Sequence, residues 1–518
     1  MYRFAVFLSV WACAALLSAC GGGNSGMAAM PATPAPPARG VLLQTPPAKL
    51  ATYAPGDLLA LLGGSDLGKQ LLQLAYTPRC TIDVHQIKYQ TVDPAGAGTS
   101  ASGALMVPSG SDPACTGTRP ILLYAHGTST NRKFNIADIH DGSNTEGLLL
   151  AAVFAAQGYI VIAPNYVGYD SSTLGYHPYL IADQQSKDMI DALAAARSAL
   201  PTSSAPATSA SAKLFVTGYS EGGYVAMATH RAMQAVGTTV SASAPMSGPY
   251  ALSAFGDAIF EGEVSGGAPV NATLLITGYQ RAYGNLYVQP TDLFEAKYAP
   301  NIEGLLPNTL PVSRLRAAGK LPDSAIFSST PPDPTYASFT PATAPAALAA
   351  AFAIGFGTDF LITNAYRLGF LQDAQKAPDG SFPTVTDGLP PSAPMHPLRQ
   401  DLKINDLRTW SPTAPVLLCG GDTDPTVFFF NTQLMQQYWT AHPASPAPVF
   451  LDVDASVASG DPYARIKKGF AVAKDVVRAK AVLDGATDGG ASAVLEVYHA
   501  GLVPPFCISA VKSFFDAL

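Results

Sequence analysis

Between residues 119 and 250, unbroken apolar runs alternate with segments in which apolar residues recur at helical spacing. The apolar runs are RPILLYAHG, YIVIAPNY, AKLFVTGY and VSASAPM, and each is typical of a strand that is covered on both faces. Helical segments stand between them: TEGLLLAAVFAAQG, DQQSKDMIDALAAARSAL and SEGGYVAMATHRAMQAV. This alternation predicts an α/β fold, with a mostly parallel sheet and helices on both of its faces.

The alternation is interrupted twice along the chain. Before it, IDVHQIKYQTVD and SASGALMVPS alternate apolar and polar residues and predict a pair of antiparallel strands. Residues 251–410 are helical and loop-like, which predicts a helical lid inserted into the sheet. Strand character returns in APVLLCGGDTDPTV and PVFLDVD, and AVLEVY is expected to be one more strand before a closing helix. The core would therefore comprise residues 51–250 and 411–518.

The N-terminus has the features of an export signal. Arg3 precedes an apolar run that is too short for a confident membrane span, and the run ends in Leu17-Ser18-Ala19-Cys20, which resembles a bacterial lipobox. We therefore expect a signal peptide over residues 1–19 and lipidation of Cys20, although ordinary cleavage stays open. By the same resemblance, Gly21 favours the outer membrane, without indicating which face or whether the protein is released. The Pro/Gly-rich residues 20–50 would form a tether.

Composition excludes one class of partner. Charged residues make up only 13% of the 518-residue chain, the formal net charge is −7, and no basic run occurs. Nucleic-acid binding needs a concentration of Lys and Arg, so nucleic acid is not an expected partner. We expect a monomer that reaches the membrane only through Cys20.

The segment KLFVTGYSEGGYVAM places a serine in the pattern G-x-S-x-G, between an apolar strand and a helix. This context is typical of a nucleophile elbow, in which a sharp turn raises the serine above the sheet. A Cβ at Gly218 or Gly222 would collide with the neighbouring backbone in such a turn. Ser220 is therefore the candidate nucleophile, and a simple turn serine is the alternative.

A serine nucleophile needs a histidine base and a carboxylate that orients it, in the chain order Ser, Asp, His for this architecture. The strand VLLCGG is followed by Asp422 and Asp424, of which the spacing after Gly421 favours Asp424. His499 follows VLEVY, and His442 lies in a proline-rich loop where a solvated side chain is expected. We predict Asp424 as the acid and His499 as the base.

Two backbone N–H groups would form the oxyanion hole. The residue after the nucleophile, Glu221, should provide one of them. The other should come from the loop after ILLYAHG, from Gly127 or Thr128. His126 is expected to shape that loop rather than to act as a second base.

From Tyr76 to Leu518 the chain resembles the secretory lipases and esterases of the α/β-hydrolase superfamily. The resemblance rests on YAHGT, VIAPNYVGYD, YHPYLIADQQSKDMIDALAAAR, GYSEGG, SAPMSGPY, LKINDLRTWSPTAPVLL and GDTDPTV. It implies the α/β-hydrolase fold with a helical lid before the acid strand, hydrolysis of carboxylic esters, and no cofactor. The long segment between Asp424 and His499 departs from the family pattern.

Four cysteines lie beyond the predicted signal and lipobox, and an even number in an exported chain predicts two disulfides with three possible pairings. Cys419 leads to Asp424 and Cys507 follows His499, so a shared site brings these two together. Cys80 and Cys115 flank the N-terminal strand pair and should bridge each other. No zinc-type spacing occurs, and the loop DVDASVASGDPY matches a calcium loop only in part, because Tyr463 replaces its bidentate acid. We predict no metal site.

The predicted function is a lipase or esterase that acts on a small-molecule or lipid-like ester. Apolar segments such as AAAFAIGF in the lid and VFFFN after Asp424 would line an acyl site, unless they only fill the core of the lid. An exported serine peptidase on the same fold and a polyester-degrading hydrolase are the alternatives.

Overall fold

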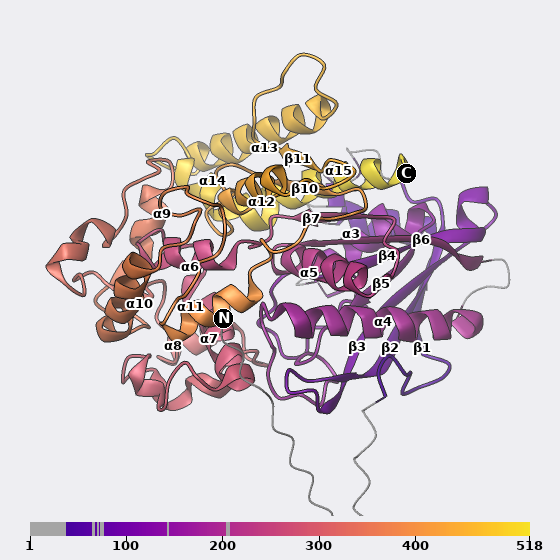
Figure 1. The fold of residues 1–518 in the computed structure, drawn as a ribbon. Helices are drawn as coiled ribbons and strands as arrows, with labels where there is room; N and C mark the ends of the chain where they lie inside the picture. Colours follow the sequence, from indigo (N-terminus) through magenta and orange to yellow (C-terminus); the bar gives the residue numbers. More distant parts are fainter. Residues whose placement is uncertain (1–37, 65–67, 70–71, 73–76, 142–143, 204–207) are drawn as a thin grey trace, which may run out of the picture. The chain divides into compact units, whose positions relative to one another are not determined.

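A single large sheet organises the described part of the chain. The computed structural model describes residues 38–64, 68–69, 72, 77–141, 144–203 and 208–518, so the predicted signal peptide and Cys20 lie outside the described residues. Within these residues the sheet has nine strands in the order β1-β2-β3-β5-β4-β6-β7-β10-β11 (Figure 1). The β1–β2, β2–β3 and β3–β5 pairs are antiparallel, and the pairs from β5 to β11 are parallel.

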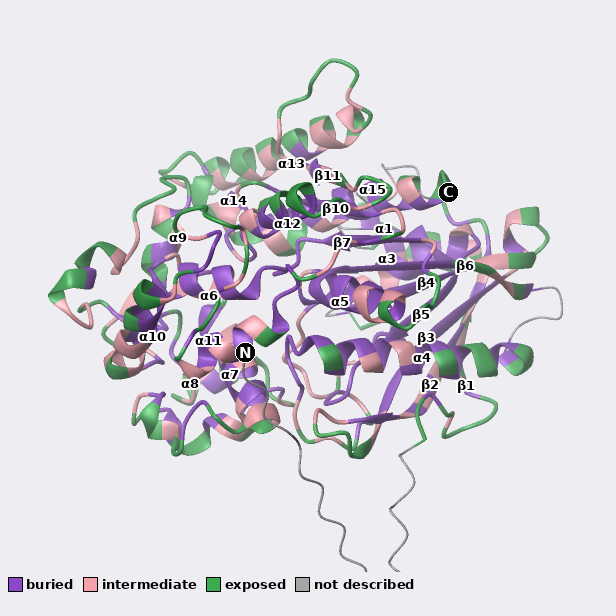
Figure 2. Ribbon diagram, in the orientation of Figure 1, coloured by how far each residue is buried: buried purple, intermediate pink, exposed green. Residues whose placement is uncertain are grey.

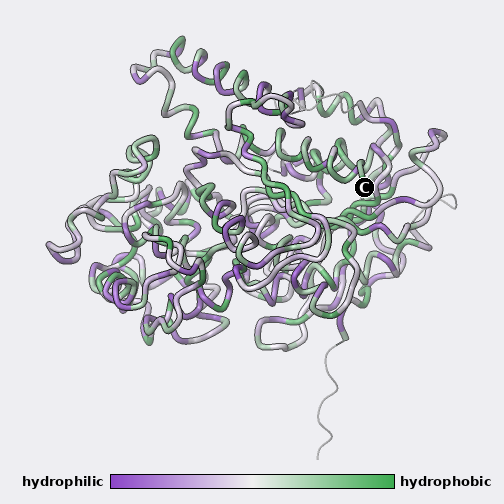
Figure 3. Tube along the Cα trace, turned by 45° about the horizontal axis from the view of Figure 1, so that its top comes forward, coloured by the Kyte–Doolittle hydropathy of each residue, from purple (hydrophilic) through white to green (hydrophobic). Residues whose placement is uncertain are grey.

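The parallel strands are β4 Gly117–Ala125, β5 Ile160–Pro164, β6 Thr208–Tyr219, β7 Ala242–Met246, β10 Leu417–Gly420 and β11 Val449–Asp452. Successive side chains of a strand point to opposite faces. Ile121 and Leu123 of β4 therefore join the apolar cluster of α4 (Ala182–Ser203) and α5 (Glu221–Ala235). Leu122 of β4 joins the cluster of α3 (Thr145–Val153) and α15 (Val503–Asp516). The strands are apolar on both faces for this reason. Figure 2 shows most of their length as buried, and Figure 3 shows hydrophobic stretches of the chain trace gathered in its interior.

The antiparallel pair predicted near the N-terminus is present as β2 (Thr81–Val92) and β3 (Gly98–Ser109), in register from Thr81–Ser109 to Val92–Gly98. A further strand, β1 (Ala48–Tyr53), pairs with β2 and is followed by α1 (Pro55–Gly63).

Residues 38–50, which their composition assigns to the tether, also contact the sheet. The N–H of Gly40 donates to the carbonyl oxygen of Gln90 at 2.8 Å. The guanidinium of Arg39 pairs with Asp191 of α4 at 3.0 Å. These residues pack on the sheet because the edge of β2 satisfies their backbone groups.

The predicted helical insertion lies between β7 and β10. Its helices are α6 Leu252–Phe260, α7 Ala268–Tyr283, α8 Val312–Ala317, α9 Ala349–Ile354, α10 Asn364–Lys376 and α11 Pro397–Asn405, with a small pair of strands, β8 Phe327–Ser328 and β9 Phe356–Gly357. A buried ion-pair cluster joins three of the helices. Arg399 of α11 pairs with Asp257 of α6 at 2.7 Å and with Asp373 of α10 at 2.8 Å. We use the word lid for residues 251–410.

The C-terminal part differs from its prediction at one element. It contains α12 (Phe430–Ala441), α13 (Ala464–Leu483) and α14 (Ala491–Val497), and a π-helical turn, η6 (Tyr498–Leu502), leads into α15. The segment AVLEVY is therefore helical, and the prediction of a strand there is wrong. Val494, Tyr498 and Leu502 are the buried residues of this segment, a spacing of four that is helical. By length and composition, residues 491–516 are apolar enough to cross a membrane, but 61% of the 18-residue apolar window within this segment is buried in the fold.

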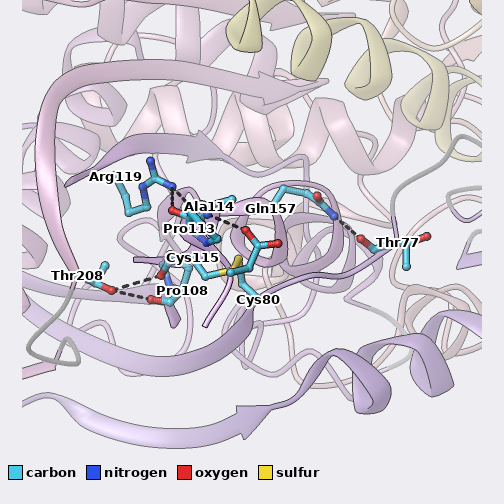
Figure 4. The surroundings of a disulfide bond; sticks show 10 residues. Thr77, Cys80, Pro108, Pro113, Ala114, Cys115, Arg119, Gln157 and Thr208 are labelled. Atoms are coloured by element: carbon cyan, nitrogen blue, oxygen red, sulfur yellow. Dashed lines mark hydrogen bonds between the residues drawn. A yellow bond between two sulfur atoms is a disulfide. The ribbon is translucent and has the colours of Figure 1, made fainter. Parts of the chain in front are cut away.

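Both predicted disulfides are present. Cys80 and Cys115 bridge with a Cα–Cα distance of 5.3 Å beside η1 (Pro113–Cys115), where Thr208 of β6 donates to the carbonyl oxygen of Pro108 at 3.1 Å (Figure 4). Cys419 and Cys507 bridge with a Cα–Cα distance of 5.6 Å. The second bridge joins β10 to α15, so the strand before Asp424 is tied to the helix after His499.

Candidate active site

Ser220 occupies the tight turn between β6 and α5. Its φ of 59° and ψ of −123° lie in a region that residues other than glycine rarely adopt. A Cβ added to Gly218 would lie 2.3 Å from the carbonyl oxygen of Gly222. A Cβ added to Gly222 would lie 2.0 Å from the carbonyl oxygen of Ala125 on β4. The two glycines of the motif therefore allow the backbone to approach closely enough to form the turn.

Ser220, His499 and Asp424 form one continuous chain of hydrogen bonds. The Oγ atom of Ser220 lies 2.8 Å from Nε2 of His499, and Nδ1 of His499 lies 2.7 Å from Oδ2 of Asp424. The other carboxylate oxygen of Asp424 accepts the N–H groups of Thr426 and Val427 at 2.9 and 3.1 Å. Asp424 is fully buried, so its carboxylate has a fixed direction toward the histidine.

Asp422 and His442, the alternative acid and base in the sequence, lie apart from this series of hydrogen bonds. Asp422 is exposed, and its backbone N–H donates to Asp452 at 3.1 Å. His442 caps the C-terminal end of α12, where it is exposed and its Nδ1 lies 3.1 Å from the carbonyl oxygen of Tyr438. Neither side chain lines the cavity beside Ser220.

The loop after β4 contributes Gly127 and Thr128 to the cavity wall. The N–H of Gly127 donates to the two carboxylate oxygens of Glu146 at 3.0 and 3.2 Å, so it is not free for a substrate. The N–H of Thr128 has no hydrogen-bond partner among the described residues, and the Thr128 hydroxyl lies 2.9 Å from the Tyr179 hydroxyl. His126 is buried, with Nδ1 2.6 Å from the carbonyl oxygen of Gly127, in agreement with the role of shaping this loop.

Glu221 lies at the start of α5, as the sequence predicts, and its side chain belongs to a buried polar cluster that the sequence did not reveal. Its Oε1 atom lies 2.7 Å from Nε2 of His177 and accepts from the Gln185 amide at 2.7 Å. These contacts fix the residue that follows the nucleophile. No local signal in the YHPY and DQQ segments indicates that His177 and Gln185 meet Glu221.

Tyr219 contacts the hydrogen-bonded chain, and Glu146 lies beside it at the cavity wall. The Tyr219 hydroxyl donates to the carbonyl oxygen of His499 at 2.5 Å, which fixes the π-helical turn beside Ser220. Burial raises the pKa of Glu146 to about 7. A glutamate in the first turn of a helix is ordinary in a sequence, so only the fold reveals that Glu146 faces the cavity.

The cavity beside Ser220 has a volume of about 330 Å³ and is mostly apolar. Its lid side comes chiefly from α6 and α7, through residues such as Leu252, Phe255, Ile259 and Leu275. Phe352 of AAAFAIGF and Phe428 of VFFFN are instead buried against each other in a separate cluster, with ring centroids 5.5 Å apart. Of VFFFN, only Val427 lines the cavity, so these two segments mainly fill the core of the lid.

The DVDASVASGDPY loop binds protein groups. Asp452 accepts the N–H of Asp454 at 2.8 Å, and Asp454 accepts the Tyr498 hydroxyl at 2.7 Å and pairs with Lys474. Within the described ranges, no cluster of three or more His, Cys, Asp or Glu side chains could hold a metal ion.

Solved structures resemble this chain along most of its length. A mutant of the rice cell wall degrading esterase LipA from Xanthomonas oryzae is 25% identical, with a TM-score of 0.66, over 93% of this chain and 99% of that one. A ligand-bound form of that esterase is 25% identical, with a TM-score of 0.61, over 87% of this chain and 100% of that one. A Legionella pneumophila protein, 20% identical with a TM-score of 0.57, covers 80% of this chain and 91% of its own and shows the fold alone.

No family model and no curated protein matches the sequence. The resemblance to lipases and esterases that the motifs suggested is therefore tested by the solved structures. The chain has the α/β-hydrolase fold, and its resemblance to the lipases and esterases of that superfamily is confirmed by these structures.

Proposed function

We propose that this protein is a serine hydrolase that cleaves carboxylic esters through an acyl-enzyme on Ser220. The observation that carries the proposal is the hydrogen-bonded chain from Ser220 through His499 to Asp424 at the wall of an apolar cavity. The likeness to an esterase over nearly the whole chain supports the same reaction.

In the first half of the reaction, Nε2 of His499 takes the proton of the Ser220 hydroxyl as Oγ attacks the ester carbonyl carbon. Asp424 accepts the Nδ1–H of the imidazole and stabilises the imidazolium that forms. The tetrahedral intermediate then collapses, and His499 gives the proton to the departing alcohol. Water attacks the acyl-enzyme in the same way, which releases the acid and returns the proton to Ser220.

The negative oxygen of the intermediate needs two donors at fixed positions. We assign them to the backbone N–H groups of Glu221 and Thr128. The Glu221 N–H lies at the N-terminus of α5, where helix N–H groups have no partner within the helix. Gly127 cannot be the second donor while its N–H is bound to Glu146, so Thr128 is the better assignment of the two.

The cavity favours an ester with an apolar part of moderate size. Its volume of about 330 Å³ is at the small end of ligand pockets, and its lid side offers mostly aliphatic and aromatic side chains. The protein would act as a monomer and need no cofactor, because the chemistry is completed by its own side chains.

The location we propose is outside the cytoplasm, attached to the outer membrane through lipidated Cys20. Two disulfides within the described residues support export, because such bonds persist in oxidising compartments. The lipobox-like sequence supports the anchor.

The direct test uses a panel of p-nitrophenyl esters of increasing acyl length, with a peptide p-nitroanilide alongside. The wild type should hydrolyse the esters and not the amide. Ser220→Ala should lower kcat by a factor of about 10⁶ while its thermal unfolding is unchanged. Ester turnover by Ser220→Ala close to that of the wild type would remove Ser220 from the mechanism.

A further inference from the structure

Glu146 links α3 to the loop that carries the proposed oxyanion donor Thr128. Its Oε2 atom accepts the hydroxyl of Tyr124 on β4 at 2.6 Å, and both of its oxygens accept the N–H of Gly127 at 3.0 and 3.2 Å. Glu146 lies in the first turn of α3, where the helix dipole favours a negative charge. The side chain therefore has a fixed position at the cavity wall.

The carboxylate also lies close to the reacting groups. A Cβ built on Gly127 would be 3.1 Å from Oε1 of Glu146 and 3.7 Å from Cβ of Ser220. Gly127 therefore lies in space between the carboxylate of Glu146 and the side chain of Ser220. The carbonyl of Gly127 is bound to Nδ1 of His126 at 2.6 Å. That carbonyl shares a peptide plane with the N–H of Thr128, so holding Gly127 on both sides also sets the direction of the Thr128 N–H.

Both contacts of Glu146 are hydrogen-bond donors, so the ionised carboxylate, which only accepts, fits this position better than the protonated acid. Burial nevertheless raises the pKa of Glu146 to about 7, against the opposing effect of the hydrogen bonds from Tyr124 and Gly127. Ionisation of Glu146 therefore falls within the range in which an esterase works. The titratable groups that face it are Tyr124 on β4, Tyr166 after β5, Tyr219 on β6, Glu221 on α5 and His499 in η6.

We propose that Glu146 is a positioning residue for the oxyanion hole, which in its ionised form holds Gly127 so that the Thr128 N–H faces the developing oxyanion. This inference rests on the proposed ester hydrolysis. It adds a second group whose protonation state affects the rate, because the ionised carboxylate holds Gly127 more firmly than a neutral side chain does.

The consequence is a steeper loss of activity on the acid side. As pH falls, Glu146 gains a proton, and the neutral acid holds Gly127 less firmly than the carboxylate does. Glu146→Gln keeps a neutral acceptor for Gly127 and Tyr124 but has no proton to gain, so it stands for the protonated form at every pH. The ratio of kcat/KM of the wild type to that of Glu146→Gln should therefore be highest at the alkaline end of the range and fall toward 1 at the acid end.

The experiment measures kcat/KM from pH 5 to 9 with one p-nitrophenyl ester for the wild type, Glu146→Gln, Glu146→Ala and a matched control, Glu263→Gln. Glu263 lies in the lid outside the cavity wall, and burial raises its pKa to about 7 as well. The control should keep the pH profile of the wild type. At pH 8, Glu146→Gln should stay within about 10-fold of the wild type, and Glu146→Ala should lose about 10²-fold in kcat, as for a misplaced oxyanion donor.

A ratio of kcat/KM of an active wild type to that of Glu146→Gln that stays constant from pH 5 to 9 would overturn the inference. Equal kcat for the Ala and Gln variants would overturn it as well, because the acceptor would then have no role. If Glu146→Ala fails to fold, the pH dependence of the ratio for Glu146→Gln decides alone. A wild type inactive on every ester would instead contradict the proposed function, which is a separate result.

Discussion

Asp422 and Asp424 lie two residues apart in one turn, yet only Asp424 is buried and contacts His499. Replacing Asp424 by Asn removes the charge that stabilises the imidazolium and favours the wrong tautomer of His499, so kcat should fall by about 10⁴. Asp422→Asn changes an exposed side chain and should alter kcat by less than about 3-fold, since surface substitutions away from such sites have small effects. Steady-state kinetics of the two variants would compare them. The reverse ranking would assign the orienting role to Asp422.

At the residue level, the sequence predicted the groups whose neighbours along the chain define them. Ser220 follows from the glycines around it, and the order of Asp424 and His499 follows from the architecture. Glu146 and Tyr219 could not be found in this way. Each acts through a partner far along the chain or on another element, such as the contact between Tyr219 and His499, and no local pattern specifies it.

At the level of elements, the apolar strands of the parallel sheet were predictable because burial on both faces leaves a continuous apolar run. The segment before His499 was not, because Val, Leu and Tyr in a short run suit a strand and a buried helix equally. The site nevertheless forms, since η6 brings the histidine to the same edge that a strand would have reached.

The disulfides should differ in their effect on activity. The Cys419–Cys507 bridge closes a loop of 88 residues and joins the strand before Asp424 to the helix after His499. The Cys80–Cys115 bridge closes a loop of 35 residues that contains β2 and β3, away from Ser220. Cys419→Ser with Cys507→Ser should lower both kcat and the free energy of unfolding, the latter by about 4–5 kcal/mol. Cys80→Ser with Cys115→Ser should cost about 3–4 kcal/mol and leave kcat nearly unchanged. Urea denaturation and ester kinetics test both, and a larger loss of kcat in the second pair would contradict the assignment.

The ion-pair cluster of the lid offers a second test between elements. Arg399 is buried between α6 and α10, so Arg399→Ala leaves two buried carboxylates without their cationic partner and should cost about 3–5 kcal/mol. Lys297 forms an exposed pair with Asp359 at 2.8 Å, and Lys297→Ala should cost less than about 1 kcal/mol. Thermal and urea unfolding of the two variants measure the difference. Equal losses would mean that the buried cluster does not hold the lid helices together.

For the whole molecule, the order of segments along the chain contained most of the architecture. Helices that alternate with apolar strands leave few arrangements other than a parallel sheet covered on both faces. The helical insertion then connects two strands of that sheet, β7 and β10. The packing inside the lid could not be derived, because its short helices meet through contacts such as Arg399 with Asp257 that have no periodic signal.

Attachment to a membrane is the remaining prediction for the whole molecule, and it rests on one cysteine outside the described residues. If Cys20 is lipidated, Cys20→Ser should move the protein from the membrane fraction to the soluble fraction without changing its kcat, because the residues that line the cavity beside Ser220 all lie between residues 124 and 508. Cys13→Ser is the matched control: it removes a cysteine from the predicted signal but keeps the lipobox, so the protein should stay with membranes. Fractionation of cells that express each variant, followed by ester assays, measures both properties. Sedimentation of Cys20→Ser with membranes would show that another part of the chain is the anchor, and the lipobox interpretation would then be wrong.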